Sequence, residues 1–181
     1  MIYTVECGFA DPVREGEWND FYSHRKLPAL ISVTGFHTSQ RFKAIGAGCP
    51  TYLAVHTIGS LDVLHGEEYV EKGGGSFARW QPDIVDWHRN LYDGLDRAPD
   101  VSAGEYLVLS SIGPEALMRL GLAPHAMRAV AMEKSPERRW LATAVSSEPP
   151  CLARVPDGVH FYAAMTPQLR GVPSAAATDD R

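Results

Sequence analysis

Cysteine is scarce in this 181-residue chain, and the three that occur, Cys7, Cys49 and Cys151, show no C-x-x-C spacing. Neither a disulfide framework nor a zinc ribbon is therefore indicated, and we expect reduced thiols. Long hydrophobic runs are also missing, since a membrane span needs about 18 consecutive apolar residues and no stretch approaches that length. The N-terminal residues lack a basic region followed by an apolar segment. We therefore expect a cytoplasmic protein with no membrane partner.

Positive charge is in short supply as well, because 17 lysines and arginines face 22 acidic residues, for a formal net charge of −5. Neither sign gathers into a long run, and this argues against nucleic acid as a partner. The hydrophobic content of 45% is typical of a soluble globular protein. A core of ordinary size is expected.

Sequence motifs that are typical of a cofactor-binding site or of a catalytic nucleophile are absent too. Gly73-Gly74-Gly75 neither follows a strand nor opens a phosphate-binding helix, and no G-x-S-x-G or H-E-x-x-H occurs. His56, His88 and Glu6 have the ligand types of an iron site but not its spacing. We therefore expect neither a cofactor nor a metal.

The first half of the chain has a regular order of elements. β-branched and aromatic patterns predict strands over 2–9, 36–45, 51–58 and 84–91. Three- and four-residue spacing of aromatic residues predicts a helix over about 15–25, which Pro28 breaks or restarts, and a second helix is expected over about 60–72. The order βαββαβ is that of a ferredoxin-like α+β unit, which we assign to residues 1–95.

The second half predicts a smaller version of the same unit over residues 105–170. A Gly-, Asp- and Pro-rich linker over 94–104 separates the two. Strands are expected over 105–112, 125–133, 139–145 and 159–165, with a short helix to about 120 and the second helix shrunken or absent. The tail over 171–181 is small and polar and is expected to be disordered.

The stretch Glu17-Trp18-Asn19-Asp20-Phe21-Tyr22-Ser23-His24-Arg25-Lys26-Leu27-Pro28, followed by the strand that contains Arg41, resembles the first half of an EthD-like subunit. Tyr22, Arg41 and the Leu27-Pro28 break carry the match; Lys26 takes a place where relatives often have a histidine. The resemblance implies a dimeric α+β barrel with a small-molecule cavity. The two halves would close a barrel within one chain, or the first half would pair across a homodimer, and a homo-oligomer is expected.

Strand alternation sorts the side chains into two faces. In the first strand Tyr3, Val5 and Cys7 are assigned to the helix-packed face, and polar groups of all four first-half strands are assigned to the opposite one. The resulting set is Glu6, His37, Arg41, Tyr52, His56, Asp86 and His88. The alternative interpretation is the solvated side of an open sheet. Buried in a barrel, such groups would need mutual hydrogen bonds or a ligand.

The candidate catalytic residues are His56 and His88, with Glu6 and Asp86 as the carboxylates that orient them. Arg41 is the candidate anchor for a carboxylate or enolate, because its planar fork binds two oxygens at once. The remaining candidate substrate-binding residues are Trp18, Tyr22, His24, His37 and Tyr52. An aromatic stripe such as Trp18 and Tyr22 is otherwise ordinary core packing.

Acid and base groups together with the absence of cofactor motifs predict a cofactor-independent enzyme that moves a proton on a small carbonyl, cyclic or aromatic metabolite. A lyase, isomerase, cyclase or decarboxylase would fit. The alternative function is that of a non-catalytic small-molecule-binding or accessory protein of a degradation pathway.

Overall fold

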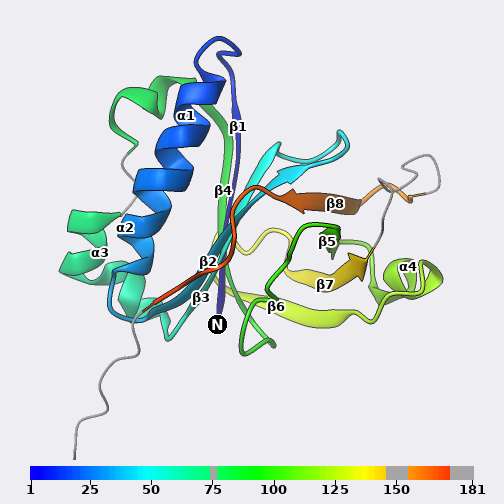
Figure 1. The fold of residues 1–181 in the computed structure, drawn as a ribbon. Coiled ribbons are helices and arrows are strands. Elements are labelled where there is room, and N and C mark those ends of the chain that lie inside the picture. The colour runs from blue at the N-terminus through cyan, green and yellow to red at the C-terminus, as the bar shows by residue number, and fades with distance from the viewer. Residues whose placement is uncertain (74–76, 146–154, 172–181) are drawn as a thin grey trace, which may run out of the picture.

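The structure is a computed structural model of the chain and describes residues 1–73, 77–145 and 155–171 (Figure 1). The first half contains β1 (Ile2–Phe9), α1 (Glu15–Phe21), a π-helical turn (Tyr22–Lys26), α2 (Leu27–Ile31), β2 (Phe36–Ala44), β3 (Tyr52–Ile58), a 3-10 turn (Leu61–His65), α3 (Glu67–Lys72), a second 3-10 turn (Ala78–Asp83) and β4 (Ile84–Asp93). The second half contains β5 (Glu105–Ser110), α4 (Pro114–Arg119), β6 (His125–Met132), β7 (Arg138–Val145), β8 (Val159–Ala164) and the short β9 (Leu169–Arg170).

The strands form a closed antiparallel barrel of eight strands, in an α+β fold. The order around the wall is β3-β1-β4-β6-β7-β5-β8-β2, and the pairing of β2 with β3 completes the circle. β9 adds to β2 beside the barrel through Thr38 and Ser39. Because the wall closes within one chain, no second copy is needed to complete the sheet, and the expected homo-oligomer stays a prediction.

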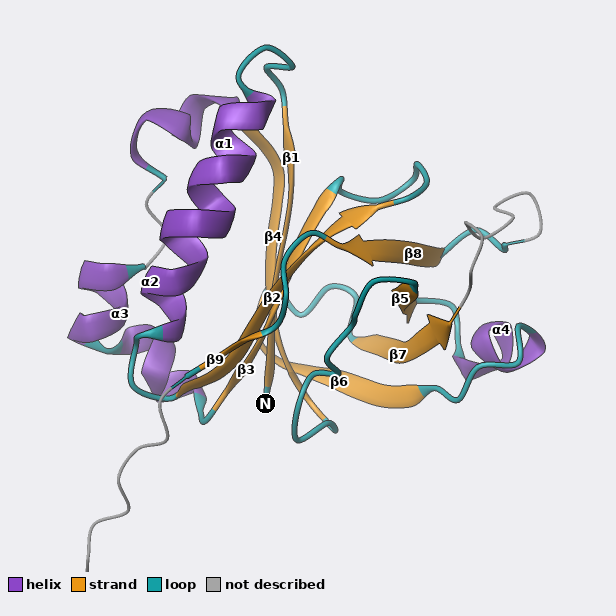
Figure 2. Cartoon of the chain, viewed as in Figure 1, coloured by secondary structure: helices purple, strands orange, loops and turns teal. Residues whose placement is uncertain are grey.

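The two halves share one strand order around the wall, which is β2-β3-β1-β4 in the first and β6-β7-β5-β8 in the second. Of the helices described, α1 to α3 cover the first half on one side, and α4 lies at the other end of the molecule (Figure 2). The place of a second helix in the second half would fall between β7 and β8, where residues 146–154 lie outside the described chain. The division into two domains stays a prediction, as does the disordered tail, of which only Gly171 is described.

The long N-terminal helix continues through Pro28 instead of stopping there. Proline has no N–H to donate and crowds the carbonyl four residues earlier, so the chain widens into the π-helical turn immediately before it. The Leu27 amide donates to the Tyr22 carbonyl across this turn, and α2 restarts with Pro28 near its beginning. Of the two alternatives predicted for Pro28, a break or a restart of the helix, the structure shows the restart.

Two buried layers lie on opposite faces of the β1–β4 wall. The aromatic layer between wall and helices contains Tyr3, Trp18, Tyr22, Phe36, Tyr52, Tyr69, Phe77 and Trp80. The barrel interior is aliphatic in the main and contains Ile2, Phe42, Leu53, Val55, Leu107, Leu109, Met127 and Leu141. Both faces of β1 and β3 are therefore buried, as are most positions of β2, whereas the first half of β4 is largely exposed, and this decides where their polar residues lie.

The linker closes one end of the barrel. Ala98 and Val101 are buried among the interior residues, the Ala98 amide donates to Thr57 Oγ1 at 2.9 Å, and the Gln40 amide group donates to the Val101 carbonyl at 2.7 Å. These bonds lie at the end of the barrel where β1 begins, because Thr57 pairs with Ile2. Access to the interior is therefore from the opposite end.

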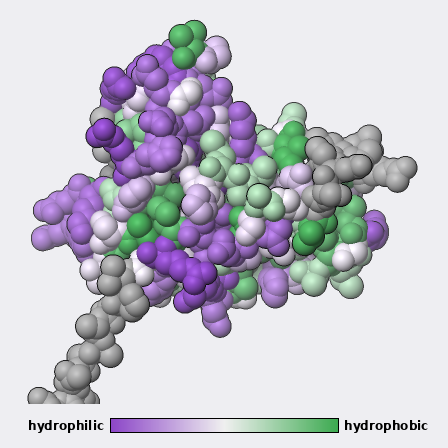
Figure 3. All heavy atoms as spheres, in the orientation of Figure 1, coloured by the Kyte–Doolittle hydropathy of each residue, from purple (hydrophilic) through white to green (hydrophobic). Residues whose placement is uncertain are grey.

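Hydrophilic residues gather over the helical side of the molecule, and hydrophobic ones are more frequent over the second half (Figure 3). Among the described residues, no helix is both long and apolar enough to cross a membrane.

Candidate functional site

An ion pair spans the open end of the barrel. Glu6 on β1 and Arg139 on β7 both face the interior, since they pair with the interior residues Leu53 and Met127 on neighbouring strands. Arg139 Nη2 lies 3.0 Å from Glu6 Oε1 and 2.9 Å from Oε2. Glu6 is only 2% exposed. A carboxylate buried this deeply needs a counter-charge, and Arg139 supplies it.

Of the two terminal nitrogens of the Arg139 guanidinium, only Nη2 takes part in this ion pair. Nη1 is buried and has no hydrogen-bond partner among the described residues. Burial opposes the charge of Arg139, but the Glu6 carboxylate together with Tyr92 and Tyr162 raises the pKa of Arg139 above its usual value. The residue therefore stays cationic and keeps a spare donor, an arrangement suited to a further oxygen acceptor.

A cavity of about 220 Å³ lies over this ion pair. Its lining includes Glu6, Arg139, Cys49, Tyr162, Ser110 and His160. The Tyr162 hydroxyl and the Cys49 thiol are hydrogen-bonded, and burial, followed by the Glu6 charge, raises the pKa of Tyr162 well above its usual value. Burial likewise raises the pKa of Cys49. Both groups therefore keep their protons at neutral pH, and because one of the two protons is used in the bond between them, the other is left to donate to a further acceptor.

His160 at the start of β8 is the titratable group at the rim. Burial, with the Arg139 charge as a further cause, lowers the pKa of His160 below its usual value. The imidazole is therefore neutral at pH 7 and has an unprotonated ring nitrogen that can accept a proton. Of the histidines described, it is the one that lines this cavity.

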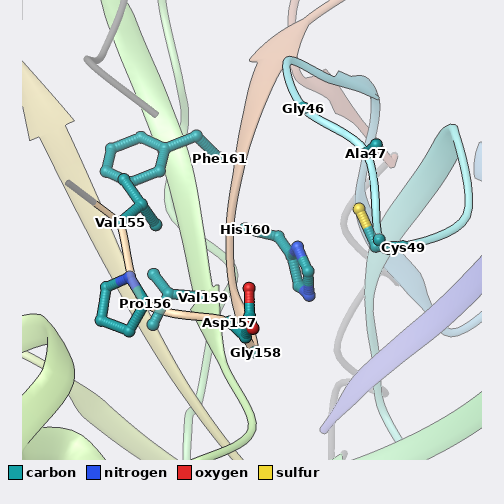
Figure 4. A pocket seen from close by; sticks show the side chains of 11 residues that line it. Gly46, Ala47, Cys49, Val155, Pro156, Asp157, Gly158, Val159, His160 and Phe161 are labelled. Atoms are coloured by element: carbon teal, nitrogen blue, oxygen red, sulfur yellow. The ribbon is translucent and has the colours of Figure 1, made fainter. Parts of the chain in front are cut away.

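A second lobe of about 290 Å³ adjoins the first and shares Gly48, Cys49 and His160 with it. Figure 4 shows His160 pointing into the space between β8 and the Gly46–Cys49 loop, with Asp157 below it and Val155, Val159 and Phe161 on the far side of the strand. We call the two lobes together the mouth cavity. Its inner lobe contains the Glu6–Arg139 pair, and both lobes combine polar and apolar surface.

Four of the predicted substrate-binding residues come together, but away from this cavity. Arg41 lies under the helices with its guanidinium 4.1 Å from the centre of the Tyr22 ring, 5.0 Å from that of Trp18 and 5.5 Å from that of Tyr52. Its Nη1 donates to Ser23 Oγ at 2.9 Å and its Nη2 to Asn19 Oδ1 at 2.9 Å. These contacts make Arg41 part of the aromatic core, and its predicted place on the barrel-facing side is corrected.

His56 is likewise on the helix-covered face, opposite the face of Glu6. Its ring stacks on Tyr3 with centroids 5.5 Å apart, meets Phe36 edge-on, and its Nδ1 lies 2.8 Å from Ser39 Oγ. Burial lowers the pKa of His56 to about 3, so it stays neutral. The predicted pairing of His56 with Glu6 and His88 is corrected, because antiparallel register places Tyr3, not Glu6, beside His56.

The other predicted residues lie at the surface. His88 is opposite Glu6 in register, yet its side chain is half exposed and its Nδ1 lies 2.8 Å from Glu133 Oε2. Asp86 is exposed at a β-bulge, with a φ of 49°. His24 is exposed and paired with Asp20, and His37 is exposed where β2 shifts register after Phe36. Of the four predicted catalytic residues, only Glu6 lines the mouth cavity.

The aromatic core leaves very little free space. A cavity of about 10 Å³ lies among Tyr3, Tyr22, Lys26, Tyr69, Phe77 and Trp87. That volume admits about one water molecule. The mouth cavity is therefore the better candidate for a bound metabolite.

Sequence reasoning missed Arg139, Tyr162, His160 and the role of Cys49, all of which contact the cavity from the second half or the β2–β3 loop. One signal pointed there, namely a glutamate in the middle of an apolar strand. Within the described ranges, no group of three or more His, Cys, Asp or Glu side chains is arranged to hold a metal ion.

Comparisons with known proteins support the fold. No family model matches the chain, and no curated protein does either. A solved structure described as an anthrone oxidase-like protein superposes with a TM-score of 0.54 and 13% sequence identity, covering 97% of this chain and 95% of that one. At this identity the likeness shows the α+β barrel fold and not a function.

Proposed function

We propose that the chain is a small-molecule enzyme that binds a compound bearing an anionic or carbonyl oxygen in the mouth cavity and transfers a proton on it. The observation that carries the proposal is the spare, buried Nη1 of Arg139 beside a neutral histidine. The reaction class is that of a lyase or isomerase which needs no cofactor. Kinship with the EthD-like group is part of the proposal and is supported by Tyr22, Arg41 and the Leu27-Pro28 break.

His160 is assigned as the general base. Its unprotonated nitrogen takes a proton from the carbon next to a carbonyl group, and the electron pair of the broken C–H bond moves into the new carbon–carbon double bond as the carbonyl oxygen becomes an enolate oxygen. Return of the same proton to another atom completes an isomerisation. Expulsion of a leaving group from the enolate, with the proton passed to that group, completes a lyase reaction.

Arg139 is assigned to the oxygen that gains charge. A preformed, largely buried cation stabilises an enolate more than a neutral carbonyl, and this difference is what accelerates the reaction. Glu6 holds the guanidinium in place through Nη2. The hydrogen-bonded pair of Tyr162 and Cys49 supplies one further neutral donor to the same lobe.

The size of the cavity limits the substrate to a small metabolite. The inner lobe of about 220 Å³ lies below the range of about 300–1,000 Å³ that is usual for drug-sized ligands, and the adjoining lobe extends it. A compact substrate whose oxygen-bearing head lies in the inner lobe beside Arg139 would match the lining.

Phenylpyruvate is a suitable probe because it has a carboxylate, a ketone and an enolisable methylene. We expect the purified protein to accelerate deuterium exchange of that methylene in D₂O, measured by proton NMR. His160→Asn should lower the rate by about a hundredfold. His65→Asn, at an exposed position on the helical side, is the matched control and should leave the rate unchanged. The rate should fall in acid as His160 becomes protonated, with its midpoint below the usual histidine pKa.

Two outcomes would redirect the proposal. Chemical-shift changes at His160 without exchange would favour the binding or accessory function over catalysis. Anthrone is the second probe, because the structural neighbour is described as anthrone oxidase-like. Oxygen uptake with anthrone, undiminished in His160→Asn, would place oxidase chemistry elsewhere in the molecule.

A further inference from the structure

A second hollow lies on the outside of the barrel, across β6 and β7. Its volume is about 390 Å³, and we call it the outer groove. It is lined by Arg128, Arg138, Trp140, Val130, Ala126 and Met127, together with Asp93 at the end of β4 and the following Gly94. It shares no lining residue with the mouth cavity.

Two arginines stand side by side in this groove, and Asp93, the cross-strand partner of Arg128 on β4, forms no ion pair within 4.0 Å with either of them in the described chain. Arg128 and Arg138 are direct cross-strand partners. Like charges at opposed positions of an antiparallel pair repel each other. Arg128 has one distant ion pair, with its Nε 3.9 Å from Glu137 Oε1, and both of these side chains are exposed. Arg138 has no ion pair within 4.0 Å in the part of the chain that the structure describes.

A flat apolar surface lies directly beside the arginines. Trp140 pairs with Ala126 at the next position along the two strands. Because alanine is small, the space over it stays open next to the half-buried indole. Val130, which is 37% exposed, borders the same hollow. The groove thus combines two guanidinium groups with the face of an aromatic ring and a branched aliphatic side chain.

We infer that the outer groove is a binding site for a small aromatic carboxylate. The carboxylate lies between Arg128 and Arg138, whose guanidinium forks bind two oxygens and whose repulsion the anion relieves. The aromatic ring of the ligand packs against Trp140 and Val130. A polyanion such as nucleic acid fits less well, since the chain carries a net charge of −5.

The site is independent of the proposed proton transfer. Successive residues of a strand point to opposite faces, so Arg138 lines the outer groove while Arg139 faces the barrel interior. A ligand in the groove therefore touches the outer side of the strand that carries Arg139. The groove can be tested without disturbing the ion pair with Glu6.

The probe is 2-naphthoate, with 2-naphthylmethanol as its uncharged counterpart, added to the full-length protein labelled with ¹⁵N. We expect binding in the range of about 1 mM or tighter, with shifted amide signals along β6 and β7 and at the Trp140 indole. The neutral alcohol should bind at least about tenfold more weakly, and added NaCl should weaken the naphthoate.

Arg128→Gln and Arg138→Gln should each weaken naphthoate binding at least about tenfold, and Trp140→Leu should weaken both the acid and the alcohol. Arg119→Gln, which removes an exposed arginine from α4, is the matched control and should bind like the wild type. Arg138→Gln should also keep its deuterium exchange with phenylpyruvate, so that failure of one proposal is distinguishable from failure of the other.

Three results would overturn the assignment. These are the absence of naphthoate binding, equal affinity in Arg138→Gln and the wild type, and shifts confined to His160 and Cys49. The last would place the carboxylate in the mouth cavity. Because the arginines are exposed and repel each other, the glutamine variants should fold, and a thermal midpoint no lower than that of wild type would confirm this.

Discussion

Replacing Glu6 by glutamine should destabilise the protein strongly. Glu6→Gln keeps the size of the side chain but removes the negative charge, which leaves the Arg139 guanidinium in the barrel without a counter-charge. Both oxygens of Glu6 lie within 3.0 Å of Arg139 Nη2, and the two side chains are 3% and 13% exposed. Breaking a buried pair of this kind costs about 3–5 kcal/mol.

A loss of that size is a large part of the total free energy of unfolding. Domains of ordinary size have free energies of unfolding of about 5–15 kcal/mol. Urea unfolding followed by far-UV circular dichroism should show a lower midpoint for Glu6→Gln with an unchanged slope. Asp20→Asn removes a carboxylate from the exposed pair with His24 and should change the free energy by less than about 1 kcal/mol.

A double variant distinguishes the cost of leaving Arg139 unpaired from the cost of losing both charged side chains. Glu6→Leu combined with Arg139→Met replaces the pair by apolar side chains, and such replacements are often neutral or stabilising. We expect the double variant to be more stable than Glu6→Gln and to lose the deuterium exchange. If Glu6→Gln costs less than about 1 kcal/mol, the pair is solvated, and the assignment of Arg139 as a buried anchor is wrong.

Three further predictions concern residues that the structure places away from the mouth cavity. Arg41→Ala should lower the free energy of unfolding by about 3–5 kcal/mol in the same urea assay, because it removes a buried side chain and the donor to Asn19 Oδ1 and Ser23 Oγ. A loss within about 0.5 kcal/mol would show a solvated arginine. His56 has a pKa of about 3 in the folded state and about 6.5 in the unfolded state, so the unfolded state binds more protons between these two values. The free energy of unfolding should therefore fall as the pH drops through that window, by at most about 1.4 kcal/mol per pH unit. His56→Phe should flatten this pH dependence, and an unchanged pH dependence in the variant would contradict the prediction. His88→Ala should change the free energy of unfolding by less than about 1 kcal/mol, since the pair of His88 with Glu133 is half exposed. The variant should also keep the rate of deuterium exchange with phenylpyruvate. Loss of that exchange would show that His88 is catalytic.

The order of elements could be predicted from the sequence because each has a local signal. Alternation and β-branched residues mark the strands, and Pro28 marks the restart of the helix. The α+β barrel followed from the repeated order and from the resemblance. The short β9 was missed, since two residues carry no periodicity.

The faces of the strands could not be predicted in the same way. All seven residues of β3 are buried, so the contrast between apolar and polar positions does not say which face meets the helices. Assigning Tyr52 and His56 to the face of Glu6 was wrong, because the residues of β3 that share that face are Leu53 and Val55, and the barrel interior is also apolar. Bulges after Phe36 and at Asp86 also shift the register of β2 and β4, and no residue type in those strands predicts where a bulge occurs.

Arg139 shows most clearly where local information ends. Glu6 in an apolar strand required a counter-charge, but its partner lies 133 residues away, and the neighbouring Arg138 is chemically identical. Only the register of β7 decides which of the two enters the barrel, and a slip of one residue would exchange their faces. The interior position of Leu141 and the outward position of Trp140 set that register. The mouth cavity needs Arg139 inside the barrel, and the outer groove needs Arg138 outside it. Both sites therefore depend on the same register of β7, which the Glu6 variant tests through its ion pair with Arg139 and the Arg138 variant tests at the outer face.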